Sequence, residues 1–353
     1  MDNVKDRSLV IQSIVVNDAS KCFVIAEIGH NHQGNIDIAK RMIKAAVEAG
    51  ASAVKLQKRD NRSLFTSSYY NRPYNSENSF GDSYGEHREF LEFDHDQYKE
   101  LQNYSIELGT IFFATAFDFK SADFLQNLNI PAFKVASGDL KNLPLINYLA
   151  DFGKPLIIST GGGYQEDINR VVESLEEKKT PYSILQCTAG YPPAWNELNL
   201  GVITTLRNKF PNPVIGFSSH DNGIAMSVAA YALGARIIEK HFTLNRTLKG
   251  TDHAFSLEPQ GLGKLVRDLD RLHVALGDGV KSQYESESDP LQKMGKKIVA
   301  AKALFKGTVL GEGDFDFKSP GDGLPPWRIQ EIIGKILTRN LDFEEAVIED
   351  DFL

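Results

Sequence analysis

Eight short apolar runs in this sequence each end in polar residues, and the types of those residues suit a chemical site. Lys55 and Lys134 leave apolar runs, and hydroxyl side chains end several of the other runs. Two ammonium groups beside several hydroxyls are suited to bind a phosphate group. The hydroxyl residues grouped with the lysines are Thr115, Ser137, Ser159 and Ser218. The alternative, in which each lysine only extends its ammonium to solvent, is disfavoured for two lysines with four hydroxyls.

A second group of residues could bind a metal ion. His220 and His241 end two successive apolar runs, and Glu27 ends the first of the eight. Two neutral imidazoles, completed by water or substrate oxygens, form a divalent site that suits Mn, Co, Zn or Mg. The alternative is a pair of hydrogen-bonded structural histidines, and the carboxylate favours the metal. Glu27 is the candidate general acid or base, because burial and neighbouring cations can shift a carboxyl pKa in either direction.

The remaining polar and thiol residues near these runs are less informative. The loop GHNHQGN offers Asn31 and His32, for which a loop-shaping role and a substrate contact are equally supported. Cys22 and Cys187 lie in apolar runs and are expected to be core thiols, since no evident base adjoins either one.

A barrel of eight parallel strands is the fold that would position these residues. Short β-branched runs alternate with helical patterns, which indicates a parallel sheet. Eight strand–helix units in about 255 residues favour a closed (β/α)8 barrel, and no GxGxxG motif supports a dinucleotide-binding fold. The expected strands are 22–29, 53–57, 111–117, 132–137, 155–160, 182–188, 214–220 and 236–242. Working residues of such barrels lie at the C-terminal strand ends, which would bring both groups into one pocket.

The rest of the chain is expected to flank this catalytic barrel, which is predicted for residues 1–276. Residues 1–21 form a cap segment, in which IQSIVV could be a hairpin over the barrel floor. A polar linker is predicted for 277–294, and a compact unit for 295–353. That unit contains strand-like KIVAAKAL and KILTRN and a short helix RIQEIIG. About 60 residues suit a lid or clamp better than a catalytic domain.

Bulk composition restricts the partners. The chain has 353 residues, of which 42% are hydrophobic and 24% charged, as in a soluble enzyme. Its formal charge of −8 argues against a nucleic acid or an anionic membrane as partner. No run approaches the ~20 apolar residues of a membrane span, and the first residues lack the apolar core of a secretory signal. Two cysteines fit a reducing compartment, so a cytoplasmic location is expected.

Taken together, the strand-end motifs resemble those of the N-acetylneuraminate (sialic acid) synthase family over essentially the whole chain. The segments that carry the resemblance are AEIGHNHQGN, VKLQK, SYGEHREFLEF, DHDQYKEL, FKVASGD, ISTGG, LQCTAGYP, GFSSHDNG and EKHFTLNRTLKGTDHAFSLEP. The resemblance implies a TIM barrel followed by a small antifreeze-like SAF domain of the β-clip type. It also implies condensation of phosphoenolpyruvate with an N-acylated hexosamine, either N-acetylmannosamine or its 6-phosphate, with release of phosphate.

The resemblance also implies a role for each candidate residue. His220 and His241 would be catalytic through a divalent ion, with Mn favoured over Mg or Co, and Glu27 would be the catalytic carboxylate. The enolphosphate would be held by Lys55, Thr115, Lys134, Ser137, Ser159 and Ser218. The sugar would face Gln57, Asp139, Tyr191 and Asp252. Family members form domain-swapped homodimers, in which the antifreeze-like unit of one chain closes the barrel of the other.

Two positions depart from the pattern of bacterial members. Ala189 follows the Cys–Thr pair where those members have Asn or Ser, and Ser319 stands where they often have Arg. The missing arginine and the long insert at 71–90 resemble the animal-type enzymes, which use a 6-phosphorylated sugar. Lys318 could pair with that phosphate, or it could be a solvated surface residue. The choice between the free and the phosphorylated sugar stays open at this point.

Three alternatives to a sialic acid synthase remain. A synthase for another nonulosonate, of the legionaminate, pseudaminate or KDN type, would share the same site. A metal-dependent aldolase that cleaves a phosphorylated sugar acid would also need two histidines and a phosphate site, but not the C-terminal unit. A carbohydrate- or ice-binding protein would explain that unit alone and would leave the polar strand ends without a role.

Overall fold

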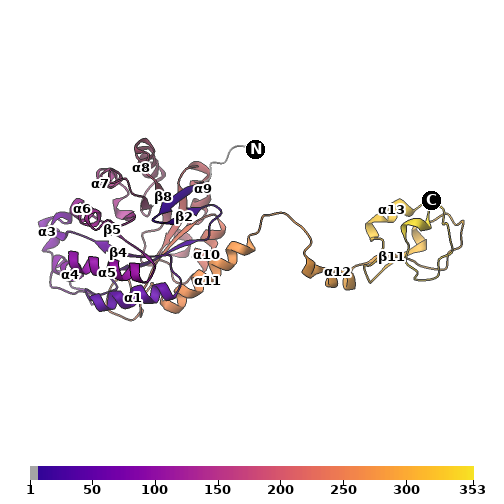
Figure 1. The fold of residues 1–353 in the computed structure, drawn as a ribbon, viewed down its shortest axis with the longest axis horizontal. Coiled ribbons are helices and arrows are strands. Elements are labelled where there is room, and N and C mark those ends of the chain that lie inside the picture. The colour runs from indigo at the N-terminus through magenta and orange to yellow at the C-terminus, as the bar shows by residue number, and fades with distance from the viewer. Residues whose placement is uncertain (1–6) are drawn as a thin grey trace. The chain divides into compact units, whose positions relative to one another are not determined.

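The computed structural model describes residues 7–353, which fall into two compact units (Figure 1). The first unit ends at Gly277, and the second comprises Asp278–Leu353. Residues 1–6 of the predicted cap segment lie outside the described part of the chain. Within residues 7–353, no helix is long and apolar enough to span a bilayer.

An eight-stranded parallel barrel forms the centre of the first unit. Neighbouring strands follow one another in chain order, and the last strand pairs with the first. The strands are β3 (Phe23–Gly29), β4 (Ala53–Lys58), β5 (Ile111–Ala116), β6 (Phe133–Val135), β7 (Leu156–Ser159), β8 (Tyr182–Cys187), β9 (Val214–Ser219) and β10 (Ile237–His241). The predicted (β/α)8 fold is therefore confirmed, and every strand lies at a predicted run.

Barrel closure sets the positions of the candidate residues. Glu27 on β3 pairs with His241 on β10 and with Lys55 on β4. Lys134 on β6 pairs with Thr115 on β5. The candidate side chains thus enter the same end of the barrel from neighbouring strands, as the C-terminal-end rule predicts.

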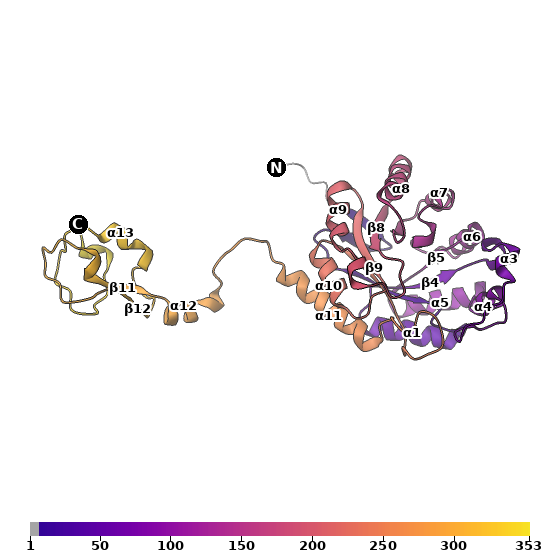
Figure 2. The same cartoon turned by 180° about the vertical axis from the view of Figure 1, so that it is seen from behind.

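Helices surround the barrel (Figure 2). They are α1 (Ile36–Glu48), α5 (His95–Glu107), α6 (Phe119–Asn127), α7 (Leu143–Ala150), α8 (Gln165–Lys178), α9 (Gly201–Lys209), α10 (Ala225–Ala232) and α11 (Pro259–Ala275). Helix α1 shows why they form: the Asn35 side chain accepts from two backbone N–H groups of its first turn, and its apolar face is buried. Gly50 ends this helix region at φ +88°, a conformation that favours glycine.

A hairpin packs against the N-terminal ends of the barrel strands. Strands β1 (Ser8–Ile11) and β2 (Ile14–Asn17) pair in antiparallel fashion, and Leu9 and Val16 belong to the buried barrel core. Arg236, which precedes β10, donates from Nε to the carbonyl of Asp18 over 2.9 Å. The predicted floor hairpin is therefore present.

An insert follows β4 and carries three short helices, α2 (Asn61–Leu64), α3 (Ser67–Tyr70) and α4 (Tyr84–Phe90). Helix α4 begins with a capping box between Ser83 and Glu86. Gly85 allows α4 to approach α3, because a Cβ at this position would lie 2.3 Å from the Tyr70 ring. The insert is therefore a packed structure and not an open loop.

The second unit has its own small core. Its elements are α12 (Ser288–Met294), β11 (Lys297–Ala300), β12 (Phe315–Lys318) and α13 (Ile329–Ile332), and β11 pairs with β12 in antiparallel fashion. Ile298, Leu304, Ile332, Leu341 and Val347 are buried in the core. The segment KILTRN, predicted as a strand, forms isolated bridges at Ile336 and Leu337 instead. The predicted linker is helical at its end, where α12 forms.

Candidate functional site

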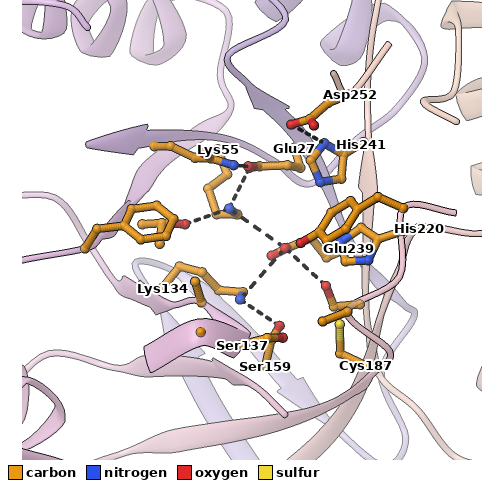
Figure 3. A pocket seen from close by; sticks show the side chains of 18 of the residues that line it. Glu27, Lys55, Lys134, Ser137, Ser159, Cys187, His220, Glu239, His241 and Asp252 are labelled. Carbon is orange, nitrogen blue, oxygen red and sulfur yellow. Dashed lines mark hydrogen bonds and ion pairs between the residues drawn. The ribbon is translucent and has the colours of Figure 1, made fainter. Parts of the chain in front are cut away.

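A cavity of about 730 Å³ lies at the C-terminal ends of the barrel strands. We call it the barrel pocket. Every barrel strand contributes a side chain to its lining: Glu27, Lys55, Thr115, Lys134, Ser159, Cys187, Ser218 and Glu239. Figure 3 shows the side chains of Glu27, Lys55, Lys134, Ser159, Cys187 and Glu239 converging on one space. A pocket at this end of a barrel is where such enzymes bind their substrates.

Two lysines and two carboxylates form a buried charge network in the barrel pocket. Lys55 Nζ lies 2.5 Å from Glu27 Oε2 and 3.8 Å from Glu239 Oε1. Lys134 Nζ lies 3.9 Å from Glu239 Oε1 (Figure 3). Both ammonium groups also donate to hydroxyls, Lys55 to Thr115 over 2.9 Å and Lys134 to Ser159 over 2.7 Å. The side chains of the predicted phosphate site are therefore brought together.

The two carboxylates differ in their readiness to hold a proton. Burial raises the pKa of Glu27 to about 7, although Lys55 opposes this shift. Burial would also raise the pKa of Glu239, but Lys134 and Lys55 outweigh it and the net direction is downward. Glu239 is therefore a fixed counter-charge for the lysines, whereas Glu27 can take up and release a proton near neutral pH.

The remaining hydroxyls have distinct positions. Ser218 donates to Glu239 Oε1 over 3.3 Å, and Ser137 accepts from the backbone N–H of Gly161 over 3.0 Å. Both residues line the barrel pocket, together with Ala189. Because the Ser137 oxygen accepts in this bond, its hydroxyl proton can be directed at the neighbouring Cys187 thiol or at a ligand.

His220 and His241 lie side by side in the pocket wall, with ring centroids 5.3 Å apart. Nδ1 of His220 lies 3.1 Å from the carbonyl of Thr188, so a proton on Nδ1 leaves Nε2 as a free lone pair. Burial lowers the pKa of His220 to about 3 and also lowers that of His241. Nδ1 of His241 is 3.7 Å from Asp252 Oδ2. Both imidazoles are thus neutral, the form that binds metal ions.

The histidine pair fits a metal ion only if other ligands come from water or substrate. Within residues 7–353, no three His, Cys, Asp or Glu residues are arranged as a metal site. Glu27, considered as a further ligand from the sequence, is paired with Lys55 instead. The buried Nδ1 of His241 has no hydrogen-bond partner in this part of the chain. Two neutral imidazoles with an unsatisfied nitrogen suit a divalent ion that keeps open positions.

Three of the residues predicted to face the sugar line the barrel pocket: Gln57, Tyr191 and Asp252. The Tyr191 ring lies over His220 at a centroid distance of 4.0 Å. Asp139 is not among the lining residues. It is the last residue of the short 3₁₀ turn Ser137–Asp139, and its carboxylate accepts from Asn142 over 3.1 Å.

Lys318, the other predicted sugar contact, lies on β12 in the second unit. Its ammonium pairs with Glu344 and lies 3.8 Å from Asp316. It also lies 5.0 Å from the centre of the Phe343 ring. Two carboxylates of its own unit therefore already compensate its charge, and its predicted pairing with a sugar phosphate stays a prediction.

The loop after β3 has a structural role. Asn31 Nδ2 donates to the carbonyl of Phe242 over 2.9 Å and to Ser256 Oγ over 3.0 Å. The His32 ring stacks on Phe93 with a centroid distance of 4.2 Å. Of the two alternatives considered for Asn31 and His32, the structure favours the loop-shaping role.

Sequence reasoning missed several lining residues. Cys187 was expected in the core but lines the barrel pocket, where burial raises the pKa of its thiol. Its position as the last residue of β8 is a signal that could have placed it there. Arg59 continues the alternation of Lys55 and Gln57, which was a usable signal. Arg88 comes from the insert helix α4, for which the sequence offers no comparable signal.

Comparison with known proteins decides the family. Residues 42–281 match the NeuB family, and residues 297–347 match the SAF domain. The chain belongs to the NeuB family. This NeuB-family chain is 41% identical to N-acetylneuraminate-9-phosphate synthase of Homo sapiens over 93% of its own length and 92% of that protein. It is 36% identical to N,N'-diacetyllegionaminic acid synthase of Campylobacter jejuni, over 93% of this chain and 99% of that protein.

A solved structure agrees with this assignment to the NeuB family. The N-acetylneuraminic acid (sialic acid) synthetase from Leptospira borgpetersenii, in complex with citrate, superposes with a TM-score of 0.70 at 34% identity. The match covers 81% of this chain and 95% of that chain. The predicted family and the C-terminal SAF domain are therefore confirmed.

Proposed function

We propose that this protein is a nonulosonate synthase that condenses phosphoenolpyruvate with N-acetylmannosamine or its 6-phosphate and releases inorganic phosphate. The observation that carries the proposal is the buried network of Lys55, Lys134, Glu27 and Glu239 at the C-terminal barrel ends. The names of the relatives support the sugar class, since they are synthases of N-acetylneuraminate 9-phosphate and of legionaminic acid. Another nonulosonate of the legionaminate or pseudaminate type is the second candidate product, because a pseudaminic acid synthase of Campylobacter jejuni is 32% identical.

The lysines and hydroxyls are the proposed binding site for the enolphosphate. Lys55 and Lys134 supply two positive charges, and Thr115 and Ser159 already contact them. Charge-assisted hydrogen bonds of this kind are strong in a buried site. As the anion engages Lys55, the attraction between Lys55 and Glu27 weakens, and Glu27 becomes a better proton acceptor.

Glu27 is the proposed proton-transfer group of the condensation. C3 of the enolphosphate attacks the aldehyde carbon of the open-chain sugar, and protonated Glu27 gives its proton to the aldehyde oxygen. Water then adds to the cationic C2, and Glu27 takes back a proton from this water. The C–O bond to phosphate breaks as the remaining C2 hydroxyl proton passes to the leaving phosphate, which gives the keto acid and one phosphate for each new carbon–carbon bond.

A divalent ion is the proposed cofactor, with Mn favoured over Mg or Co. His220 and His241 would hold it, and water and the sugar would complete its coordination. When bound, the ion would polarise the sugar aldehyde as a Lewis acid. Tyr191, which lies over the His220 ring, would limit the access of bulk water to this part of the pocket.

A phosphate-release assay tests the proposed function. The full-length protein is incubated with phosphoenolpyruvate, Mn²⁺ and either sugar, and inorganic phosphate is measured. We expect release that requires the sugar. Release without any sugar would indicate a phosphatase, and pyruvate formed from a phosphorylated sugar acid would indicate an aldolase. Either result would contradict the proposal.

Loss of either lysine should weaken phosphoenolpyruvate binding. Lys55→Ala and Lys134→Ala each remove a buried charge-assisted hydrogen bond, which costs ~1.5–3 kcal/mol, or roughly ten- to a hundredfold in the Michaelis constant. Initial rates at varied phosphoenolpyruvate measure this effect. Lys120→Ala, which changes an exposed lysine on α6, is the control. A wild-type Michaelis constant in the double variant would refute the phosphate assignment.

The SAF unit is proposed to act as a cover in a domain-swapped homodimer. A polar segment precedes it, and a reacting enolphosphate benefits from the exclusion of bulk water. Truncation after Asp289 should leave a folded barrel, because the first unit has its own core, with most of the sugar turnover lost. Circular dichroism, light scattering and the phosphate assay measure these three properties. Equal activity of the truncated and the full-length protein would contradict the cover.

A further inference from the structure

Two guanidinium groups, those of Arg59 and Arg88, line the barrel pocket. Arg59 is 8% exposed, and its guanidinium makes its hydrogen bonds to neutral side chains. Glu92, which accepts from the backbone N–H of Arg59 over 3.2 Å, and Asp252 act on its charge only at longer range. It donates to Gln57 Oε1 over 2.7 Å, lies 3.0 Å from His30 Nε2, and stacks on the Phe117 ring at 3.7 Å. Arg88 lies 3.2 Å from His30 Nδ1. Neither arginine forms an ion pair within residues 7–353. Burial and the neighbouring Arg88 charge disfavour the charged form of Arg59 and lower its pKa to about 10, so an anion from outside the chain would stabilise the two guanidinium groups.

His30 cannot satisfy both arginines. Burial and the two guanidinium groups lower the pKa of His30 well below its usual value, so the ring is neutral. A neutral imidazole has one acceptor nitrogen, whereas both arginines present only N–H donors. Nε2 lies 3.4 Å from Glu92 Oε1, an oxygen for which residues 7–353 offer no other hydrogen-bond partner. With the ring proton directed at Glu92, Nδ1 accepts from Arg88, and Arg59 is left with a donor that lacks an acceptor.

Arg59 and Arg88 form a second cationic site that is separate from the two lysines. Gln57 Nε2 donates to Glu27 Oε1 over 2.6 Å, and Gln57 Oε1 accepts from Arg59. The Gln57 side chain therefore lies between Arg59 and Glu27, whereas Lys55 contacts Glu27 directly. The pocket thus holds a second cationic site, which Gln57 links to Glu27, and two such sites match a reaction between two phosphorylated substrates.

A neutral donor adjoins the arginines. Asn78 lines the same pocket, and its Oδ1 accepts from the backbone N–H of Gly250 over 2.9 Å. Because that bond occupies the carbonyl end of the side chain, the amide NH₂ is available to a ligand. Asn78 belongs to the same insert as Arg88, so the insert supplies two of the three donors.

The insert holds Arg88 in a fixed position. Tyr84 Oη accepts from Arg88 Nε over 3.1 Å and from Nη2 over 2.9 Å. The Tyr84 ring is itself packed against Phe65, Tyr69 and Tyr74, with centroid distances of 5.2, 5.0 and 5.3 Å. A guanidinium that is already oriented loses little conformational freedom when it binds an anion.

We infer that Arg59, Arg88 and Asn78 bind the phosphate of a 6-phosphorylated sugar, which makes N-acetylmannosamine 6-phosphate the preferred substrate over the free sugar. The inference rests on the proposed function. A phosphate monoester carries a charge between −1 and −2 near neutral pH, and the planar forks of two arginines suit its oxygens. Binding of the sugar phosphate is thereby assigned to the barrel and its insert, whereas the sequence indicated Lys318 in the second unit.

The test compares the two sugars in three variants of the full-length enzyme. Arg88→Gln and Arg59→Gln should each raise the Michaelis constant for N-acetylmannosamine 6-phosphate by roughly ten- to a hundredfold. The Michaelis constants for free N-acetylmannosamine and for phosphoenolpyruvate should stay unchanged. Arg72→Gln is the matched control, since Arg72 lies in the same insert and stacks on Tyr69 and Tyr84 without lining the pocket.

Several results would overturn the inference. Equal use of both sugars by the wild type would do so while leaving the proposed function intact. A raised Michaelis constant for phosphoenolpyruvate alone would assign the arginines to its carboxylate. The absence of phosphate release with either sugar would overturn the proposed function itself, and the inference with it. If Arg59→Gln does not fold, Arg88→Gln, on the partly exposed helix α4, decides the question.

Discussion

Replacing Glu27 by glutamine is expected to lower kcat by roughly 10²–10⁴-fold, which is the contribution of a general acid or base. Glu27 is 1% exposed, and burial raises its pKa to about 7. The carboxyl can therefore exchange a proton near neutral pH, and a glutamine of nearly the same shape cannot. Steady-state rates with saturating phosphoenolpyruvate and sugar measure the effect, and a thermal melt checks that the variant is folded.

Glu239→Gln is the informative comparison for this variant. The nearby lysines lower the pKa of Glu239, so it remains ionised and serves as their counter-charge. Its loss should change the Michaelis constant for phosphoenolpyruvate more than kcat. A Glu27→Gln enzyme that keeps kcat within a few-fold of the wild type would show that another group transfers the proton.

Removal of divalent ions is the second change with a large expected effect. Treatment with a chelator should abolish turnover, and Mn²⁺ should restore it, because the aldehyde would lose its Lewis acid. His241→Ala should lose metal content as well as activity, which elemental analysis of the purified protein measures. His95→Ala changes a half-exposed histidine on α5 and is the control. Undiminished turnover by the metal-free enzyme would refute the metal assignment.

The sequence predicted the barrel and most of its pocket for a simple reason. Parallel strands of a closed barrel all end on one side, so polar residues after apolar runs must meet there. Glu27, Lys55, Lys134 and the two histidines followed from this rule alone. The family resemblance added their roles, which local patterns do not contain.

The remaining parts depended on contacts that no local pattern records. Arg88 reaches the barrel pocket because α4 is held by Tyr84 and Gly85 against aromatic residues of the insert. Asp139 does not line the pocket, although Ser137 and Gly138 of the same turn do, and its carboxylate accepts from Asn142 instead. The segment KILTRN forms only isolated bridges, although its residues alternate as in a strand. In each case tertiary packing, and not sequence periodicity, decided the position.

The most direct test of the proposed function follows the carbon that forms the new bond. Phosphoenolpyruvate labelled with ¹³C at C3 is incubated with the enzyme, Mn²⁺ and N-acetylmannosamine 6-phosphate, and the label is observed by NMR. The proposed reaction predicts that the vinyl CH₂ signal is replaced by that of a methylene carbon bonded to the former aldehyde carbon, with one inorganic phosphate per label converted. Label that appears in the methyl group of pyruvate, without a new carbon–carbon bond, would contradict the assignment of this protein as a synthase.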